Sequence, residues 1–362
     1  MMNHQNNYDL KNQVYVGIDV HKKTYAVTVL DRQSNKKRVT MSASPESLIA
    51  FLKNNYSESE INSTYEAGLF GFALHRKLSH CGIKNIVINP SAIEIAANNR
   101  VKTDKKDSIK LAEHLSLGRL KGIHIPTLDQ ENKRLISRTR EQLLAHRVRI
   151  GNQIKGKLFQ FGYINPSDDR AMSKKFLSSL STFNLSYELK IILDCLSNTW
   201  IYLSEQIKII DNELKNQAKS NPVIESIYQS VPGIGPISSR ILANELGDMS
   251  QFKNEKSLFS FVGLTPVEYS SGENIRQGHI SRQGNSRLRK VLVECAWMTI
   301  TKDNTLKDVF DRISLRRGKK RAIVAIARKL IGKIRACFKK NTFYEINIHK
   351  EDENNKNQKN LS

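Results

Sequence analysis

Four carboxylates are the residues of this chain whose types and spacing are best suited to chemistry. Asp19 and Glu66 each end a short extended segment, and Asp104 and Asp107 lie three residues apart at the expected start of a helix. Positions i and i+3 share a helix face, so this pair can meet two carboxylates at strand ends. Mg²⁺ prefers carboxylates together with water and substrate phosphate. Two such ions about 3.5–4 Å apart can bind the attacking and leaving oxygens of a phosphodiester.

The four acids therefore indicate Mg²⁺-dependent strand chemistry on nucleic acid. The alternative is that they only cap helices and interact with helix dipoles.

The elements that must position these acids form an α/β pattern over residues 10–125. Extended segments are expected at Val14–Ile18, Tyr25–Leu30, Lys37–Ala43, Ile61–Glu66 and Ile83–Ile88, and helices from Pro45, from Leu69 to about Ser79, and around Asp107. A three-strand meander followed by alternating strand and helix is typical of a ribonuclease-H-type domain. His21 follows Asp19 closely, and we expect it to point to the opposite side of the strand, which leaves Asp19 as the ligand.

Long helical stretches dominate residues 126–222. Apolar residues recur there every three or four positions, at Leu185, Leu189, Ile192, Leu196, Trp200, Leu203, Ile207, Ile210 and Leu214. A period near 3.5 sustained over about four heptads predicts a coiled-coil connector. The basic stretch Leu135–Phe161 either packs against this seam or faces nucleic acid. An internal helical hairpin and an intermolecular dimer remain equal alternatives.

A compact, mainly α-helical domain is expected over residues 223–345. The turn Val231–Pro236 separates two expected helices, Ile224–Ser230 and Ile237–Leu246. In this helix–hairpin–helix pattern, Gly233 and Gly235 would let backbone N–H groups approach a phosphate closely. The alternative is a plain turn between packed helices. The polar residues 346–362 are expected to form a disordered tail.

Composition points to a polyanionic partner. The formal net charge is +23 and the isoelectric point is about 9.8, and nucleic acid is the commonest partner of such a chain. A membrane surface is disfavoured, because the sequence has no long apolar run and no basic amphipathic anchor. No secretion signal follows the N-terminus. The four cysteines are far apart, which argues against a zinc site or disulfides and fits a reducing cytoplasm. With a nucleic-acid partner, we expect a bacterial-type cytoplasm and association with the nucleoid.

The excess positive charge lies mainly in the C-terminal part. Residues 276–340 contain 19 Lys and Arg against four Asp and Glu. A phosphate backbone would screen charge of this density, whereas the alternative is a solvated basic face. We expect nucleic-acid contacts from a first cluster of five cations, and a second cluster runs from Arg316 to Arg321. The first cluster comprises Arg276, Arg282, Arg287, Arg289 and Lys290.

A serine pair lies just before the first cluster, in Ser270-Ser271-Gly272. A serine in a turn beside arginines can be a nucleophile held against phosphate, although the spacing alone mostly indicates a loop. Its hydroxyl would need activation by a base or a metal. His279 is the nearest histidine, and we interpret it as a surface or phosphate-contacting residue.

Several short motifs occur in order along both expected domains. They are Val16–Val20, Tyr65–Ala67, Asp104–Asp107, Val231–Pro236, Gly263–Pro266, Ser270–Gly272, Gly278–Ser281 and Gly284–Arg289. Together they resemble the DEDD transposases of insertion sequences, the IS one-ten type family that also includes the Piv DNA invertases. The resemblance spans nearly everything except the tail.

This resemblance implies a RuvC-like ribonuclease-H-fold domain joined by a coiled coil to a transposase domain. The four acids would hold Mg²⁺, as two ions, and Ser271 would attack DNA to form a covalent phosphoserine, with Ser270 as an adjacent alternative. The metals would then lower the pKa of the serine hydroxyl, which removes the need for a separate base. The resemblance also implies a homo-oligomer, a dimer or tetramer with a composite active site, and a structured guide RNA encoded by the element.

The sequence therefore predicts a DNA recombinase of α/β plus α architecture. Its enzymatic alternatives are a site-specific DNA invertase and a metal-dependent junction endonuclease that uses the same acids without a serine intermediate. A non-enzymatic nucleic-acid-binding protein or repressor is a third alternative.

Overall fold

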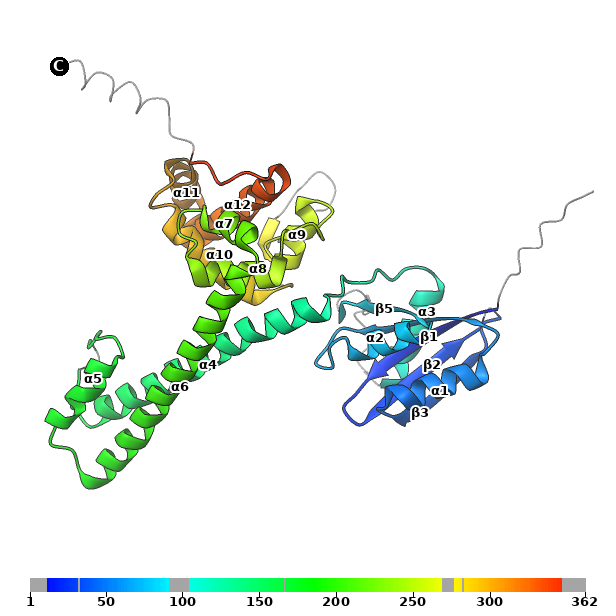
Figure 1. Cartoon of the computed structure of the whole chain (residues 1–362), viewed down its shortest axis with the longest axis horizontal. Coiled ribbons are helices and arrows are strands. Elements are labelled where there is room, and N and C mark those ends of the chain that lie inside the picture. The colour runs from blue at the N-terminus through cyan, green and yellow to red at the C-terminus, as the bar shows by residue number, and fades with distance from the viewer. Residues whose placement is uncertain are drawn as a thin grey trace, which may run out of the picture. The chain divides into compact units, whose positions relative to one another are not determined.

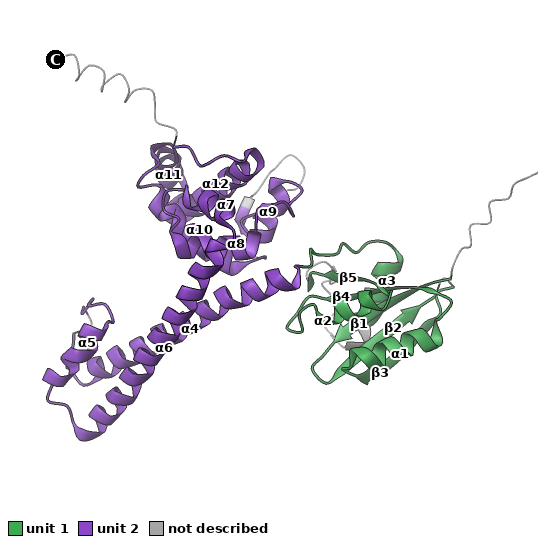
Figure 2. Cartoon of the chain, viewed as in Figure 1, with its two compact units in different colours: residues 1–125 green, residues 126–362 purple. Residues whose placement is uncertain are grey.

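A computed structural model describes residues 12–31, 33–90, 104–165, 167–268, 277–281 and 283–346 of this chain (Figure 1). Within these ranges, the side chains of residues 104–106, 268 and 277 are not described. The chain forms two compact units, residues 1–125 and 126–362 (Figure 2).

The first unit is built on a five-stranded mixed sheet. Its strands are β1 (Gln13–Val20), β2 (Thr24–Leu30), β3 (Lys36–Ser42), β4 (Glu60–Glu66) and β5 (Lys84–Ile88). They lie in the order β3-β2-β1-β4-β5, with β1, β2 and β3 antiparallel and with β4 and β5 parallel to β1. The predicted α/β character of this unit is confirmed.

Helices cover both faces of this sheet. Helices α1 (Pro45–Asn55) and α2 (Ala73–His80) bury Leu48, Leu52, Leu74 and Leu78 in one core with Val14, Val16 and Ile18 of β1. Because side chains alternate along a strand, Gly17 belongs to the other face, where α3 (Asp104–Ser116) lies. Helix α2 begins four residues later than expected, because Gly71 adopts a left-handed φ of 62° just before it.

Helix α3 approaches β1 unusually closely at Gly17. A Cβ atom on Gly17 would lie 2.1 Å from the carbonyl oxygen of Ser108 and 2.5 Å from the amide nitrogen of Ala112. The buried hydroxyls of Ser108 and Thr28 are hydrogen-bonded at 2.9 Å, and Thr28 is the β2 partner of Gly17. Only a residue without a side chain permits this approach.

The direction of α3 follows from its contacts along the sheet. Ser108, near its start, lies across from Gly17, whereas Glu113, near its end, binds Lys36 of β3 at 2.5 Å. Lys36 is paired with Leu30, which is paired with Tyr15 near the start of β1. The helix therefore runs antiparallel to β1, and its N-terminal end lies toward the carboxyl ends of β1 and β4.

The second unit is mainly helical. Its elements are α4 (Leu128–Gln160), α5 (Lys174–Ser178), the 3₁₀ helix η2 (Ser179–Thr182), α6 (Tyr187–Lys219), α7 (Pro222–Gln229), α8 (Pro236–Leu246), α9 (Glu255–Val262), β6 (Pro266–Glu268), β7 (Gln277–Ile280), α10 (Ser286–Thr299), α11 (Asn304–Arg317) and α12 (Lys319–Lys340). Helix α12 is the centre of the C-terminal core and buries Ala322, Ile326, Leu330 and Ile334 completely. Across the described residues, no helix combines the length and the apolar character needed to span a bilayer.

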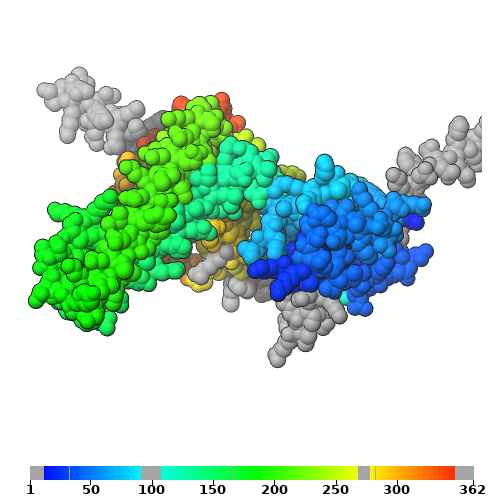
Figure 3. Space-filling model, turned by 60° about the horizontal axis from the view of Figure 1, so that its bottom comes forward, coloured from blue at the N-terminus to red at the C-terminus, as the bar shows by residue number. Residues whose placement is uncertain are grey.

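Helices α4 and α6 form an antiparallel pair, coloured from blue-green (α4) to green (α6) in Figure 3. Arg140 is ion-paired with Asp211 at one end, and Gly151 packs against the Trp200 ring further along. The buried side of α6 includes Leu193, whereas Ile192 is 40% exposed. The segment α5–η2 packs Phe176 and Leu180 into the same cluster, and this explains why the buried stripe is broader than a single heptad seam.

We expect Gly17→Ala to destabilise the protein by about 3 kcal/mol, the upper end of the cost of overpacking, because the new methyl group would collide with backbone atoms of α3. Gly156→Ala is the matched control. Gly156 lies exposed in α4, and a Cβ atom there would have no other atom within 4 Å, so alanine should stabilise by about 0.5–1 kcal/mol. Urea unfolding of both variants checks this, and equal stabilities would contradict the close-approach argument.

Candidate active site

Asp19 and Glu66 lie side by side at the carboxyl edge of the sheet. The parallel register of β1 and β4 pairs Gly17 with Thr64 and Ile18 with Tyr65, so the next residues along, Asp19 and Glu66, are neighbours. Asp19 is two residues after Gly17 and Glu66 is two residues after Thr64, which places both carboxylates on the face that α3 covers. The Asp19 side chain is 21% exposed.

The start of α3 lies toward this edge. Asp107 directly precedes Ser108, the residue that packs on Gly17. Asp104 begins the helix, but its side chain lies outside the described residues. Among the described side chains, no three His, Cys, Asp or Glu residues are grouped closely enough to hold a metal ion. The fold thus brings Asp19 and Glu66 together and directs the start of α3 toward them. Carboxylate oxygens are the donors that Mg²⁺ prefers, so the chemistry of these residues fits a divalent ion.

His21 points toward Asp19, and the prediction that it points away is wrong. Its Nε2 lies 3.0 Å from Oδ2 of Asp19. The two residues are two positions apart, so the alternation of a strand places them on the same side rather than on opposite sides. His21 therefore helps to orient the Asp19 carboxylate.

The expected nucleophiles Ser270 and Ser271 lie outside the described residues, as do Arg276 and Arg282. The hairpin that leads to them is well defined at its base. Strands β6 and β7 pair Pro266 with Ile280 and Glu268 with Gln277, and the Ser281 amide donates to the Thr265 carbonyl at 2.9 Å.

Two glycines allow close backbone-to-backbone packing at the base of this hairpin. Gly263 and Gly284 have left-handed φ values of 75° and 104°. A Cβ atom on Gly263 would lie 2.1 Å from the Gln283 carbonyl oxygen, and one on Gly284 would lie 2.5 Å from the Phe261 carbonyl oxygen. Neither position tolerates a side chain without movement of the backbone.

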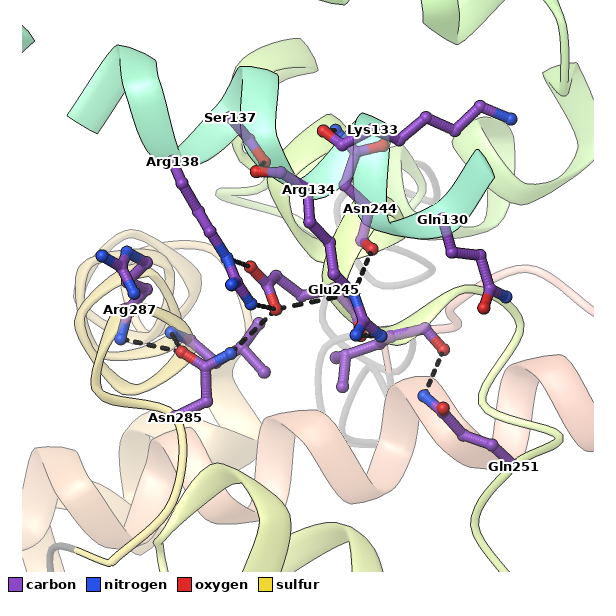
Figure 4. Close-up of polar contacts among 12 residues, drawn as sticks. Gln130, Lys133, Arg134, Ser137, Arg138, Asn244, Glu245, Gln251, Asn285 and Arg287 are labelled. Atoms are coloured by element: carbon purple, nitrogen blue, oxygen red, sulfur yellow. Dashed lines mark hydrogen bonds and ion pairs between the residues drawn. The ribbon is translucent and has the colours of Figure 1, made fainter. Parts of the chain in front are cut away.

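A buried carboxylate joins this hairpin base to α4 and α8. Glu245 is 1% exposed and accepts hydrogen bonds from Nε and Nη2 of Arg138 at 2.8 and 3.0 Å and from Nδ2 of Asn285 at 2.9 Å (Figure 4). Asn285 is also the N-cap of α10, since its Oδ1 accepts from the amides of Arg287 and Leu288. The bidentate bond to Glu245 raises the pKa of Arg138.

Arg134 forms a second set of hydrogen bonds between α4 and α8. Its guanidinium donates to the carbonyl oxygens of Asn244 and Glu245 at 3.1 and 2.9 Å. Asn244 donates in return to the Lys133 carbonyl at 3.0 Å. Burial lowers the pKa of Arg134. The start of α4 is therefore held by reciprocal polar contacts to the end of α8.

Comparison with known proteins identifies the family. A transposase model of the DEDD, IS110 type matches residues 16–162, and the model of the Transposase IS116/IS110/IS902 family matches residues 225–311. A putative transposase of Sinorhizobium fredii, y4rJ, is 31% identical over 74% of this chain and 74% of its own length. Another from the same organism, y4qE, is 29% identical over 79% and 71%. The transposase for insertion sequence element IS1111A of Coxiella burnetii is 28% identical over 70% and 71%.

The chain belongs to the DEDD transposase family of insertion sequences. It is thus a transposase, an enzyme that cleaves and rejoins DNA. The first match contains all four predicted acids, and the second contains the hairpin with Ser270 and Ser271. The family also points to a divalent metal cofactor.

Some basic residues of the transposase that were predicted to contact nucleic acid make internal contacts. Arg289 donates from Nη1 to the Val262 carbonyl at 3.0 Å, and Arg287 is ion-paired with Glu141 at 2.6 Å. Lys290 is exposed. Arg289 therefore supports the end of α9, and Arg287 connects α10 to α4, whereas contacts of these residues with nucleic acid stay predictions.

The turn between α7 and α8 of the transposase packs against α10. Gly233 has a left-handed φ of 93°, and a Cβ atom there would lie 2.7 Å from Met298 Cβ and 3.0 Å from the Cys295 carbonyl oxygen. The Thr299 hydroxyl donates to the Pro232 carbonyl at 2.6 Å. Gly235, by contrast, is exposed at the N-cap of α8 with open space around it.

Sequence reasoning did not find the Glu245 cluster. Glu245 and Arg138 are 107 residues apart and Glu245 and Asn285 are 40 apart, and a Glu near the end of an amphipathic helix is usually exposed. The one available signal was the Gly284–Arg289 motif, which contains Asn285.

Moving the charge between Glu245 and Asn285 tests this cluster. Asn285→Asp alone places a half-buried carboxylate against the buried Glu245 carboxylate, and Glu245→Gln alone leaves the partly exposed Arg138 without its bidentate anion, so each should destabilise by about 2–3 kcal/mol. The double variant restores one carboxylate and one amide across the same contact, and we expect it to recover at least half of that loss.

Urea unfolding of the four proteins provides the measurement. Glu141→Gln is the control, because its ion pair with Arg287 is more than one third exposed on both sides and should contribute less than about 1 kcal/mol. Simple addition of the two single losses in the double variant would contradict a direct Glu245–Asn285 interaction.

Proposed function

We propose that this transposase moves an insertion sequence by cutting and religating DNA through a covalent phosphoserine intermediate. Two Mg²⁺ ions would be held by the four acids Asp19, Glu66, Asp104 and Asp107. Ser271 is the proposed nucleophile, and Ser270 is the adjacent alternative. The observation that carries this proposal is the shared edge of Asp19 and Glu66, toward which α3 begins.

The proposed reaction has two balanced transesterification steps. The Ser271 Oγ attacks a DNA phosphorus atom and loses its proton, one bridging P–O bond breaks, and a DNA hydroxyl leaves. A hydroxyl of the strand to be joined then attacks the phosphoserine, and the serine leaves with its proton restored. The bound metal would stabilise charge on the attacking and leaving oxygens. Because phosphodiester bonds are exchanged rather than hydrolysed, no external energy source is needed.

We propose that the chain divides its work among its segments. Residues 10–125 form the RuvC-like nuclease domain, residues 126–222 the helical connector, residues 223–345 the transposase domain with the serine and basic helices, and residues 346–362 a polar tail. The exposed Gly235 at the start of α8 leaves a helix–hairpin–helix contact with phosphate open, although Gly233 is packed on α10.

We also propose that the connector makes a homo-oligomer, a dimer or tetramer with a composite active site. The outer surface of α6 supports this. Tyr187, Ile191, Tyr202 and Ile209 are 77%, 46%, 60% and 61% exposed, and their spacing of 4, 11 and 7 residues places them near one face of the helix. A second copy of α6 would cover this apolar stripe as a coiled-coil contact.

We propose that a structured RNA encoded by the element guides the transposase by pairing with donor and target DNA. The protein would act in the cytoplasm, at the nucleoid. The net charge of +23 supports a chain that binds more than one polyanion. Arg276, Arg282, Arg287, Arg289 and Lys290 are the proposed contacts.

Asp104→Ala should abolish Mg²⁺-dependent DNA cleavage and leave DNA affinity nearly unchanged, because it removes a proposed ligand but no surface cation. Glu113→Ala is the matched control, since Glu113 is an exposed acid at the opposite end of the same helix. A cleavage assay and a binding assay on the same duplex provide the measurement. Wild-type cleavage by Asp104→Ala, or equal inactivity of Glu113→Ala, would rule out the assigned metal site.

Ser271→Ala should abolish both recombination and the protein–DNA adduct trapped under denaturing conditions, while DNA binding persists. Ser270→Ala identifies the nucleophile if the neighbouring residue is used instead. Ser281→Ala is the control from the same hairpin, because its ordered contact is made by its backbone amide. Full activity of both Ser271→Ala and Ser270→Ala would exclude the covalent model, and cleavage without any adduct would favour a junction endonuclease.

A further inference from the structure

The corner between α11 and α12, residues Leu315–Arg321, is exposed and cationic, and we refer to this corner as the tip. All seven residues of Leu315–Arg321 are exposed, and five of them are Arg or Lys: Arg316, Arg317, Lys319, Lys320 and Arg321. None of these five forms an ion pair with a described acidic residue. The tip therefore concentrates positive charge that the described part of the molecule leaves uncompensated.

Internal electrostatics account for only two of the five cations. Arg316 and Arg317 end α11, where cations interact favourably with the helix dipole. Lys319, Lys320 and Arg321 occupy the first turn of α12, which contains no acidic residue, and cations are unfavourable at that end of a helix. An external polyanion would offset this cost.

The backbone of the tip is held in a defined conformation. Gly318 joins the two helices with a left-handed φ of 81°, its amide donates to the Ser314 carbonyl at 2.9 Å, and its carbonyl accepts from the Ala322 amide at 3.1 Å. Ala322 and Ile323 follow directly and are 0% and 3% exposed in the core. A rigid element presents the charged residues, which favours a defined binding geometry.

One apolar side chain stands among these charges. Leu315 is 90% exposed, whereas α11 faces the core with Leu306 and Phe310. At 100° per residue, position 315 is rotated by about 180° from position 306 and 140° from position 310. Core packing therefore gives no reason for a leucine here. Asp308 and Asp311 lie one to two turns earlier on α11 and offset Lys307 and Arg312 there, so the excess positive charge of α11 lies at the corner.

We propose that this corner binds double-stranded DNA, with Leu315 inserted at a base step from the minor groove and the surrounding cations on the flanking phosphates. Proteins that bend DNA from the minor groove insert such an apolar wedge between base pairs, and arginine is favoured where that groove is narrow. The tip contains no aromatic residue, so it lacks the stacking platform that single-strand binders use. The minor groove of double-stranded RNA is wide and shallow, which fits a single wedge poorly.

This site goes beyond the proposed strand chemistry. It depends on the action of the family on DNA, and it is independent of whether a serine is the nucleophile. Ser271→Ala should therefore bend DNA as the unaltered protein does, and a failure of the covalent model would leave this proposal standing.

The test uses the full chain and a 30-base-pair duplex with a fluorophore at each end. Anisotropy as a function of salt reports affinity, and energy transfer between the ends reports bending. The triple variant Lys319→Gln/Lys320→Gln/Arg321→Gln should make the fall of log affinity with log salt less steep. The magnitude of the slope should decrease by about 2–3, since each phosphate contact contributes about 0.9. Leu315→Ala should leave that slope unchanged and return the energy transfer toward that of free DNA.

Matched controls separate this site from general effects. Lys208→Gln/Lys215→Gln/Lys219→Gln removes the same charge from exposed positions of α6, and Leu128→Ala removes another exposed leucine, 61% exposed. Both should behave as the unaltered protein. The proposal is overturned if the α6 variant lowers the slope equally, if Leu315→Ala bends DNA normally, or if the tip variant weakens binding of a structured RNA hairpin but not of the duplex. Leu315 lies outside the core, so thermal unfolding of Leu315→Ala should match that of the unaltered chain.

Discussion

The close packing of α3 on β1 at Gly17 is the constraint on which the candidate active site depends. Acids at the ends of β1 and β4 are neighbours through the sheet, but the acids of α3 can reach them only if that helix lies directly on the strand. The Gly17 contact with Ser108 provides this approach, and the antiparallel direction of α3 points its start toward the carboxyl edge. The absence of a side chain at Gly17 thus determines where the Asp104 and Asp107 pair of α3 can act.

In the second unit, distant elements are held together by a buried charge rather than by a close approach at a glycine alone. Its hairpin base must keep a fixed position relative to α4 and α8, and the buried Glu245 holds Arg138 and Asn285 together. A buried carboxylate without these donors would be costly, so the three residues specify one arrangement. The glycines at positions 263 and 284 complete it, because only glycine fits the backbone-to-backbone contact there.

Much of the first unit could be predicted from the sequence. Each predicted strand overlaps an observed one, because its run of apolar and β-branched residues is local to the segment. His21 shows how a local rule can be misapplied, since two positions along a strand return to the same side. Ile192 and Leu193 show a different limit, because the packing of α6 with α4 and the α5–η2 segment in one cluster decides which of them is buried. The same holds for Arg287 and Arg289, whose internal contacts depend on Glu141 and Val262, which are distant in sequence.

The sequence by itself determined the α/β pattern, the acids at strand ends, the basic C-terminal part and the family of the chain. These features are local or compositional, because backbone geometry repeats every 2 or 3.6 residues and charge can be counted. Only the tertiary structure decided the direction of α3, the burial of Glu245 and the outward position of Leu315. Each of these depends on which faces of distant elements meet, and the periodicity of one segment contains no information about its partner.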